Sequence, residues 1–363
     1  MASLFSATYT EARLRFLTAA AKAGAVDLWR YPHPLTGPLG EMLATDVAWF
    51  GPRDARAVLV TISATHGVEG FCGSAVQADW MQGIVANPLP EGIAALHIHA
   101  LNPHGFAWIR RVNEDGVDLN RNFVDFAKPL AANPGYAELH PVLLPHDVDE
   151  TTLAAADAVI GAYGAKHGTR ALEMAVSGGQ YTHPDGLFYG GTAASWSRRT
   201  VETIIEDFAL RSRDLVAVVD IHTGLGPFGY GEVICDHPTD SAELARGRAW
   251  YGSAMTEPAL GTSTSVPKVG LLDYGWMAAL GPAVTFVTLE FGTYPVEEMF
   301  RQLRADHILH RAGLPDWNDE SALAVKAALK RHFCPDDEAW RDMVTRRARE
   351  VLGQAQRGLA RDA

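Results

Sequence analysis

The sequence predicts an α/β fold with a mixed, mainly parallel central sheet, helices on both faces of the sheet, and additional helices at the C-terminus. Two observations carry this prediction. Largely apolar runs alternate with stretches of helical periodicity, which is the pattern of parallel strands joined by helical crossovers. The runs are apolar on successive residues, as expected of strands that are covered on both faces. They span residues 57–63, 95–101, 215–221 and 283–289.

The remaining elements follow from local signals. A helix is predicted over residues 8–23, ending at Gly24, because glycine favours helix C-termini. Residues 42–50 alternate like a half-buried strand, and the turn 51–54 leads to the next run, so we expect a hairpin between the two that makes the sheet mixed. Further helices are predicted over residues 74–84, 152–166, 196–210 and 241–256.

The C-terminal part of the chain is expected to form a separate helical unit. Residues 319–363 have helical periodicity that breaks at Cys334-Pro335. No internal repeat or low-complexity linker precedes them. We therefore predict one main α/β domain over residues 1–318 and a helical extension over residues 319–363.

Composition excludes several classes of partner. The 363 residues carry a formal net charge of −12, and phosphate binding needs a concentrated basic face, so no nucleic-acid partner is expected. No apolar run is long enough to cross a bilayer, so no membrane association is expected. Three widely spaced cysteines do not form a disulfide framework, and no leader peptide is recognisable, so we expect a cytoplasmic protein.

Functional side chains follow three of the buried runs. The first run leads to His66 and Glu69, the third to His222, and the fourth to Glu290. Ligands of open α/β sheets bind beyond the carboxyl ends of parallel strands. Each signal alone is weak, because H-x-x-E arises by chance and Glu290 could form a structural ion pair. Their common position favours one shared crevice.

The residue types in this crevice point to a zinc site. Two imidazoles and one carboxylate give three ligands and leave a fourth position for water. Water bound there ionises near pH ~7, and a carboxylate that is not a ligand can move its proton. We predict one zinc ion per chain on His66, Glu69 and His222, with Glu290 as the general base and acid.

A second polar cluster occupies residues 117–123 (VDLNRNF) and is preceded by Arg110 and Arg111. An Asn-Arg pair can hold a substrate carboxylate, because a guanidinium makes a two-point contact with it. An arginine near the metal can stabilise the oxyanion of a tetrahedral intermediate. Taken alone, the segment would be interpreted as a surface loop rich in salt bridges.

Together these motifs resemble the zinc metallocarboxypeptidase family over roughly residues 50–300. The resemblance implies a zinc carboxypeptidase-like catalytic domain, and residues 179–186 and 289–293 look like an uncharacterised bacterial subgroup. The motifs that carry it are His66-x-x-Glu69, Asn102-Pro103-x-Gly105-Phe106, the run from Arg111 to Phe123, His222 and Glu290.

The resemblance also implies individual roles, and the substrate tyrosine of the family would fall between His222 and Glu290. It implies that His66, Glu69 and His222 hold zinc, that Asp118 orients His66, and that Glu290 is the base and acid. It further implies that Arg111 stabilises the oxyanion, with Arg110 as the alternative. Asn120 and Arg121 would bind the terminal carboxylate of the substrate, and Tyr274 is the candidate for the substrate tyrosine.

The function expected from the resemblance is hydrolysis of a C-terminal peptide or amide bond next to a free carboxylate. An N-acyl-amino-acid deacylase of the succinylglutamate desuccinylase and aspartoacylase kind shares the same layout, so the expected partner is a peptide or an acyl-amino-acid substrate. A non-catalytic metal-binding module is a third reading, against which intact Glu290 and Arg111 count.

Two further motifs suggest other sites. Residues 224–229 spell G-x-G-x-x-G, but the strand-like stretch 231–235 after them leaves no helix to receive a pyrophosphate. His97 and His99 lie on one face of a predicted strand. They are interpreted as buried histidines that form hydrogen bonds within the sheet.

Overall fold

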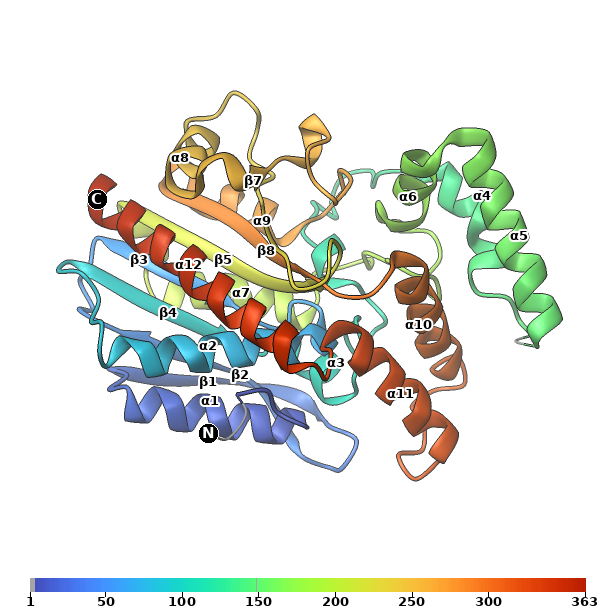
Figure 1. Cartoon of the computed structure of the whole chain (residues 1–363), viewed down its shortest axis with the longest axis horizontal. Coiled ribbons are helices and arrows are strands. Elements are labelled where there is room, and N and C mark those ends of the chain that lie inside the picture. The colour runs from blue at the N-terminus through green and yellow to red at the C-terminus, as the bar shows by residue number, and fades with distance from the viewer. Residues whose placement is uncertain (1–3, 148) are drawn as a thin grey trace.

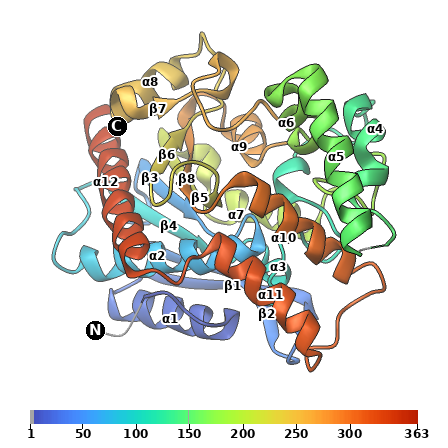
Figure 2. The same cartoon turned by 45° about the vertical axis from the view of Figure 1, so that its right-hand side comes forward.

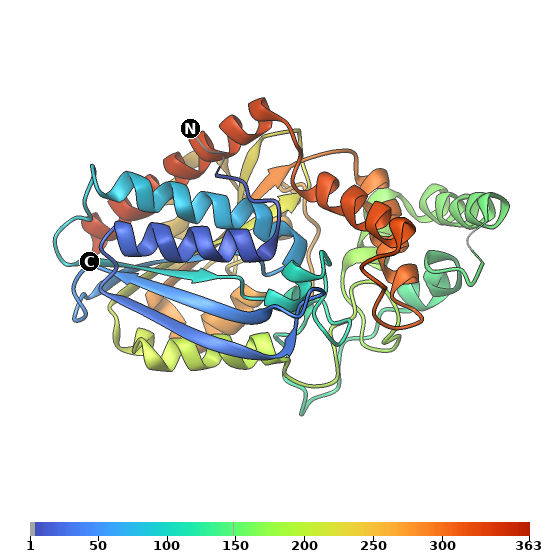
Figure 3. The same cartoon turned by 90° about the horizontal axis from the view of Figure 1, so that it is seen from below.

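The structure, a computed structural model, describes residues 4–147 and 149–363. Within them, an eight-stranded mixed sheet has the order β1-β2-β4-β3-β5-β8-β6-β7. Helices cover both of its faces (Figures 1 and 3), so the predicted fold class is confirmed. The strands are β1 (Asp27–Thr36), β2 (Met42–Phe50), β3 (Ala57–Ile62), β4 (Ile93–His99), β5 (Leu215–Gly224), β6 (Gly231–Ile234), β7 (Met255–Thr256) and β8 (Val284–Gly292).

The centre of the sheet is parallel and completely buried. β3 pairs in parallel with β4 and β5, and β5 pairs in parallel with β8. Every residue of β3 and β5 is buried. Leu59 belongs to the hydrophobic core on one face, whereas Val58 and Val60 belong to the core on the other. Side chains alternate between faces along a strand, so an apolar run that supplies two cores is apolar throughout.

The predicted hairpin between residues 42–50 and β3 is wrong. β2 pairs antiparallel with β1 on one side and with β4 on the other, so β4 separates it from β3. β1 has no clear signal in the sequence, because its residues are mostly exposed and include Pro32 and Pro34. Proline lacks the N–H of a sheet ladder and is tolerated on an edge strand such as this one.

Helices form a layer on each face of the sheet. α1, α2 and α12 lie on one face and α7 on the other (Figure 3). Thr8 caps α1 by accepting a hydrogen bond from the backbone N–H of Glu11, as expected of a threonine N-cap. The helices are α1 (Tyr9–Lys22), α2 (Gly70–Ile84), α3 (Pro103–Ala107), α4 (Pro134–Leu143), α5 (Glu150–His167), α6 (Thr169–Ser177), α7 (Trp196–Asp207), α8 (Ala242–Tyr251), α9 (Leu272–Leu280), α10 (Val296–Leu309), α11 (Glu320–Phe333) and α12 (Glu338–Asp362).

The two C-terminal helices pack against the ends of the central strands. Thr223 Oγ1 donates to the carbonyl of Phe333 over 2.6 Å, and Trp340 Nε1 donates to the carbonyl of Gly292 over 2.9 Å. Both bonds join α11 and α12 to the ends of β5 and β8. The domain boundary at residue 318 stays a prediction, although the residues after it contribute to the same core.

A group of helices stands beyond the end of the sheet toward which β5 and β8 run. It consists of α4, α5 and α6, with α10 beside them (Figures 1 and 2). Arg304 joins α10 to α4 and α5, because it donates to the carbonyl of Leu143 on α4 and pairs with Asp157 on α5. In residues 4–147 and 149–363, no helix is long and apolar enough to span a membrane.

Candidate active site

The strand ends bring the predicted site residues together. His222 and Glu290 are direct partners in the register of β5 and β8. His66 and Glu69 lie on the short turn that follows β3. Gly67 lets this turn pack on α3, since a Cβ on it would lie 2.0 Å from a backbone carbon of Gly105. The close approach therefore requires glycine between the two polar residues.

Three side chains form a cluster with the donor types of a zinc site. One ligand atom each from His66, Glu69 and His222 lies within 4.8 Å of the others, and all three residues are buried. The two Nδ1 atoms are 3.1 Å apart. Zinc–nitrogen bonds of about 2.0–2.1 Å at tetrahedral angles place two imidazole nitrogens roughly 3.3 Å apart. The donor set therefore fits a tetrahedral metal ion.

Each histidine of the cluster turns its other ring nitrogen to a buried carboxylate. His66 Nε2 lies 3.1 Å from Asp118 Oδ1, and His222 Nε2 lies 2.6 Å from Asp220 Oδ2. Thr65 in turn donates to Asp220 over 2.8 Å. Such carboxylates orient metal-binding imidazoles, and Nδ1 of both rings faces the shared point. Arg111 Nη2 also contacts His66 Nε2, at 2.8 Å.

Asp220 was not among the predicted site residues, although the sequence contains a signal for it. It precedes His222 by two residues on β5, so both side chains lie on the same face of the strand. A carboxylate inside an otherwise apolar run needs a partner. The pair Asp220-x-His222 therefore predicts a buried contact of this kind.

Arg111 lies in the cavity beside the cluster, whereas Arg110 does not line it. Arg111 Nε donates to Asp118 Oδ2 over 3.0 Å, and its Nη1 lies 3.4 Å from Glu69 Oε1. Burial alone would raise the pKa of Asp118, but the charges of Arg111, His66 and Arg121 together outweigh burial and hold the pKa well below its usual range. Arg110 instead pairs with Asp306 on α10.

Glu290 also lines the cavity, with one oxygen accepting the backbone N–H of Leu225 over 3.0 Å. Burial, followed by the nearby charge of Glu69, raises the pKa of Glu290 to about 7. A carboxyl group with a pKa near neutrality can both accept and return a proton. Its position and its environment suit the role predicted for it.

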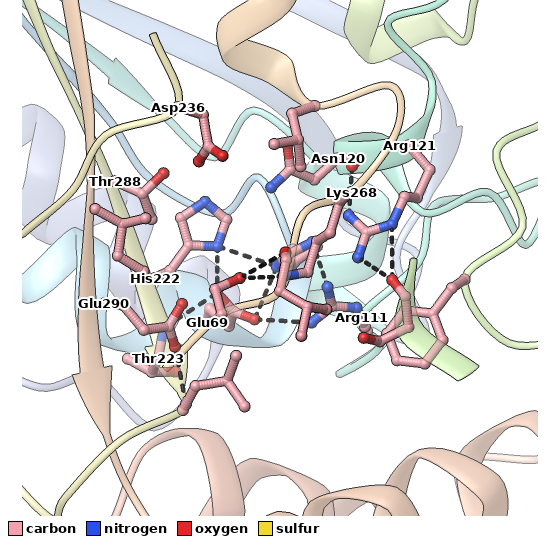
Figure 4. A pocket seen from close by; sticks show the side chains of 18 of the residues that line it. Glu69, Arg111, Asn120, Arg121, His222, Thr223, Asp236, Lys268, Thr288 and Glu290 are labelled. Carbon is pink, nitrogen blue, oxygen red and sulfur yellow. Dashed lines mark hydrogen bonds and ion pairs between the residues drawn. The ribbon is translucent and has the colours of Figure 1, made fainter. Parts of the chain in front are cut away.

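Asn120 and Arg121 line the same cavity (Figure 4). Asn120 Oδ1 accepts the backbone N–H of Leu272 over 2.7 Å, which leaves its NH₂ group for a ligand. Arg121 donates through Nε and Nη2 to the carbonyl of Ser177 and through Nη1 to that of Asn120. Since a guanidinium has five N–H donors, two remain for a substrate.

Other lining residues were not predicted. The cavity has an empty volume of about 830 Å³, counting the part open to solvent, and Asp236, Lys268 and Asp273 also line it. Tyr274 does not line it, and its hydroxyl donates to the carbonyl of Lys268 over 3.3 Å. Asp236 directly follows the strand-like stretch 231–235, as Glu290 follows its apolar run, so its position carried a signal that was not used. Lys268 lies on a loop and Asp273 in the first turn of α9, where the sequence carries no such signal.

The remaining motifs are structural. His97 Nδ1 lies 2.6 Å from Thr61 Oγ1, and His99 Nε2 lies 3.1 Å from Ser74 Oγ, with both rings fully buried. The sequence G-x-G-x-x-G at residues 224–229 forms the loop between β5 and β6. No helix follows that loop directly, as predicted.

Comparison with solved structures finds distant hydrolases. The succinylglutamate desuccinylase from Chromobacterium violaceum is 16% identical, with 89% of this chain and 74% of that chain covered and a TM-score of 0.37. The murein-tripeptide amidase MpaA from Escherichia coli O157 is 16% identical, with 87% and 97% covered and a TM-score of 0.36. An aspartoacylase family protein from Mesorhizobium loti is 13% identical, with 80% and 67% covered and a TM-score of 0.37.

These likenesses are remote, so the chemistry below rests on the residues of this chain. No curated protein matches the sequence. The sequence profile of one family matches residues 5–347, which include both the predicted main domain and most of the C-terminal helices. The chain therefore belongs to the family described as "Protein of unknown function (DUF2817)".

Proposed function

We propose that the protein is a zinc-dependent hydrolase that cleaves an amide or peptide bond next to a free carboxylate. The observation that carries the proposal is the convergence of His66, Glu69 and His222 within 4.8 Å, in a cavity that Glu290 also lines. A binding module would need the three donors alone. The additional carboxylate with a pKa near 7 supports catalysis.

The residues present fit a zinc ion, which His66, Glu69 and His222 would hold. Zinc bound there would lower the pKa of a water ligand and polarise the carbonyl group of the substrate. Glu290 takes a proton from the attacking water and passes it to the leaving nitrogen. Arg111, beside Glu69, stabilises the negative charge that develops on the carbonyl oxygen.

The substrate needs a free carboxylate because Asn120 and Arg121 bind that group. Arg121 is 1% exposed and keeps two N–H donors for a ligand, because its other donors are engaged by backbone carbonyls. Those carbonyls also fix the plane of the guanidinium. A charge-assisted contact in such a site contributes roughly 1.5–3 kcal/mol. Both peptides and N-acyl amino acids offer a carboxylate next to the scissile bond.

The experiment compares kcat/KM for matched acids and C-terminal amides of N-acyl dipeptides and N-acyl amino acids. We expect the acids to be hydrolysed roughly 10- to 100-fold faster. The relative rates of the two substrate series separate a carboxypeptidase from a deacylase. Equal rates for acid and amide would contradict the proposal and indicate an endopeptidase or an esterase.

Variants of Arg121 test whether this residue causes the preference for acids over C-terminal amides. Arg121→Ala should slow the acids and remove most of the preference. Arg121→Lys should restore it only in part, because an ammonium group cannot make the planar two-point contact. Arg331→Ala, at an exposed position on α11, is the matched control and should keep the full preference.

A further inference from the structure

Two carboxylates of the cavity belong neither to the metal cluster nor to the proposed mechanism. Asp236 follows β6, and Asp273 lies in the first turn of α9. Both line the cavity, and Figure 4 shows Asp236 on the side of Thr288, across from Arg121. Asp273 is 4% exposed. Within the described part of the chain, its Oδ1 atom is buried and has no hydrogen-bond partner.

Among the described residues no cation forms an ion pair with either carboxylate, although the charges of Lys268 and Arg121 lower the pKa of Asp236 in part. Lys268 Nζ donates to the hydroxyl of Ser265 and to the carbonyl of Val266. Arg121 donates to backbone carbonyls. Burial raises the pKa of Asp236 to about 6 and that of Asp273 well above its usual range. A buried carboxyl group without a partner is costly, and a ligand that supplies the partner removes that cost.

We propose that Asp236 and Asp273 form a subsite for a cationic group of the substrate, a primary ammonium or a guanidinium. The inference rests on the proposed function and names its substrate class. The cation belongs to the same residue as the free carboxylate, because the two subsites adjoin. Asn120 Oδ1 accepts the N–H of Leu272, the residue directly before Asp273.

The walls of the cavity fit such a residue. Ile234, Leu271 and Phe286 line it together with the two carboxylates. Apolar walls that end in a carboxylate suit an aliphatic stem with a charged tip, which is the form of lysine, ornithine and arginine. The substrate class is therefore peptides or N-acyl amino acids that end in a basic residue.

The test compares substrates that end in lysine with those that end in norleucine, which has a similar stem and no charge. Each is made as an N-acyl dipeptide and as an N-acyl amino acid and assayed with the zinc-loaded protein. A charge-assisted contact predicts a kcat/KM ratio of lysine to norleucine of roughly 10 to 100. Asp273→Asn and Asp236→Asn should each lower this ratio at least tenfold, by slowing the lysine substrate.

Asp240→Asn, an exposed aspartate near the subsite in sequence, is the matched control and should keep the ratio. Turnover of the norleucine substrate reports folding within each variant. A wild-type ratio of one or less would overturn the inference, and so would a ratio that persists in both Asn variants. If neither the lysine nor the norleucine substrate is hydrolysed, as a dipeptide or as an amino acid derivative, the proposed function fails. Calorimetry then tests the subsite on its own, by comparing the binding of free lysine with that of free norleucine.

Discussion

The two ends of the cavity differ in how their charged groups are satisfied. At the metal end, Nε2 of each histidine faces a carboxylate 2.6–3.1 Å away, and Glu69 lies 2.9–3.0 Å from the Nδ1 atoms. At the other end, Asp273 has a buried oxygen atom for which the described residues provide no partner.

The metal end is therefore held in place by the protein itself, whereas the acidic end is not. At the metal end, the side chains are oriented before a metal or substrate binds, because a buried carboxylate holds each histidine ring in place. The acidic end lacks such a partner and, in our account, gains it from the substrate. Substitutions at the metal end should therefore reduce metal binding or catalysis, whereas those at the acidic end should alter substrate choice and pH dependence.

The largest of the graded effects is expected for Glu290→Gln. The amide keeps the shape of the side chain and cannot accept a proton, so kcat should fall by on the order of 10²–10⁴. Zinc content should stay at the wild-type level, because Glu290 is not among the three clustered donors. Steady-state kinetics and elemental analysis of one sample check both statements. A wild-type kcat would make Glu290 structural.

A smaller effect is expected for the carboxylates behind the histidines. Asp118→Asn and Asp220→Asn should each weaken zinc binding by roughly 10- to 100-fold, because they disturb the orientation and basicity of the rings. Competition with a chelator of known affinity measures this. Asp236→Asn is the matched substitution at the acidic end and should leave the affinity unchanged. Equal losses in all three variants would remove the distinction between the two ends.

The smallest effect concerns stability. The folded-state pKa of Asp236 is raised to about 6, mainly by burial. Between the ordinary value near ~3.9 and this value, the folded chain binds more protons than the unfolded chain, so stability falls as pH rises. Asp236→Asn should remove this decline and gain on the order of 2 kcal/mol over the wild type between pH ~4 and pH ~7.

Urea unfolding of the metal-free protein across this pH range checks the prediction. Asp240→Asn serves as the control, since its side chain is exposed. Parallel stability curves for the wild type and Asp236→Asn would mean that Asp236 stays charged in the folded protein. The acidic end would then resemble the metal end.

The same contrast explains what could be predicted from the sequence. His222 and Glu290 directly follow apolar runs, and strand pairing makes them neighbours. The strand β1 was missed because it is an exposed edge with two prolines. Local periodicity also cannot decide which strand pairs with which, so β2 was assigned to the wrong neighbour.

At the acidic end, only Asp236 had a readable signal, because it directly follows the strand-like stretch 231–235. Lys268 and Asp273 stand on a loop and at a helix start, where polar residues are common and most face solvent. Their burial depends on helices and loops that close over the cavity from distant parts of the chain. A single sequence does not encode that closure in any local pattern.

Zinc binding by His66, Glu69 and His222 is tested most directly by the metal content of the purified protein and its variants. Elemental analysis should find about one zinc per chain in the wild type, as one cluster of this kind predicts. His66→Ala and His222→Ala should lose both the metal and the activity, while His167→Ala, at an exposed position, should keep both. Undiminished zinc in both His66→Ala and His222→Ala would contradict the assignment.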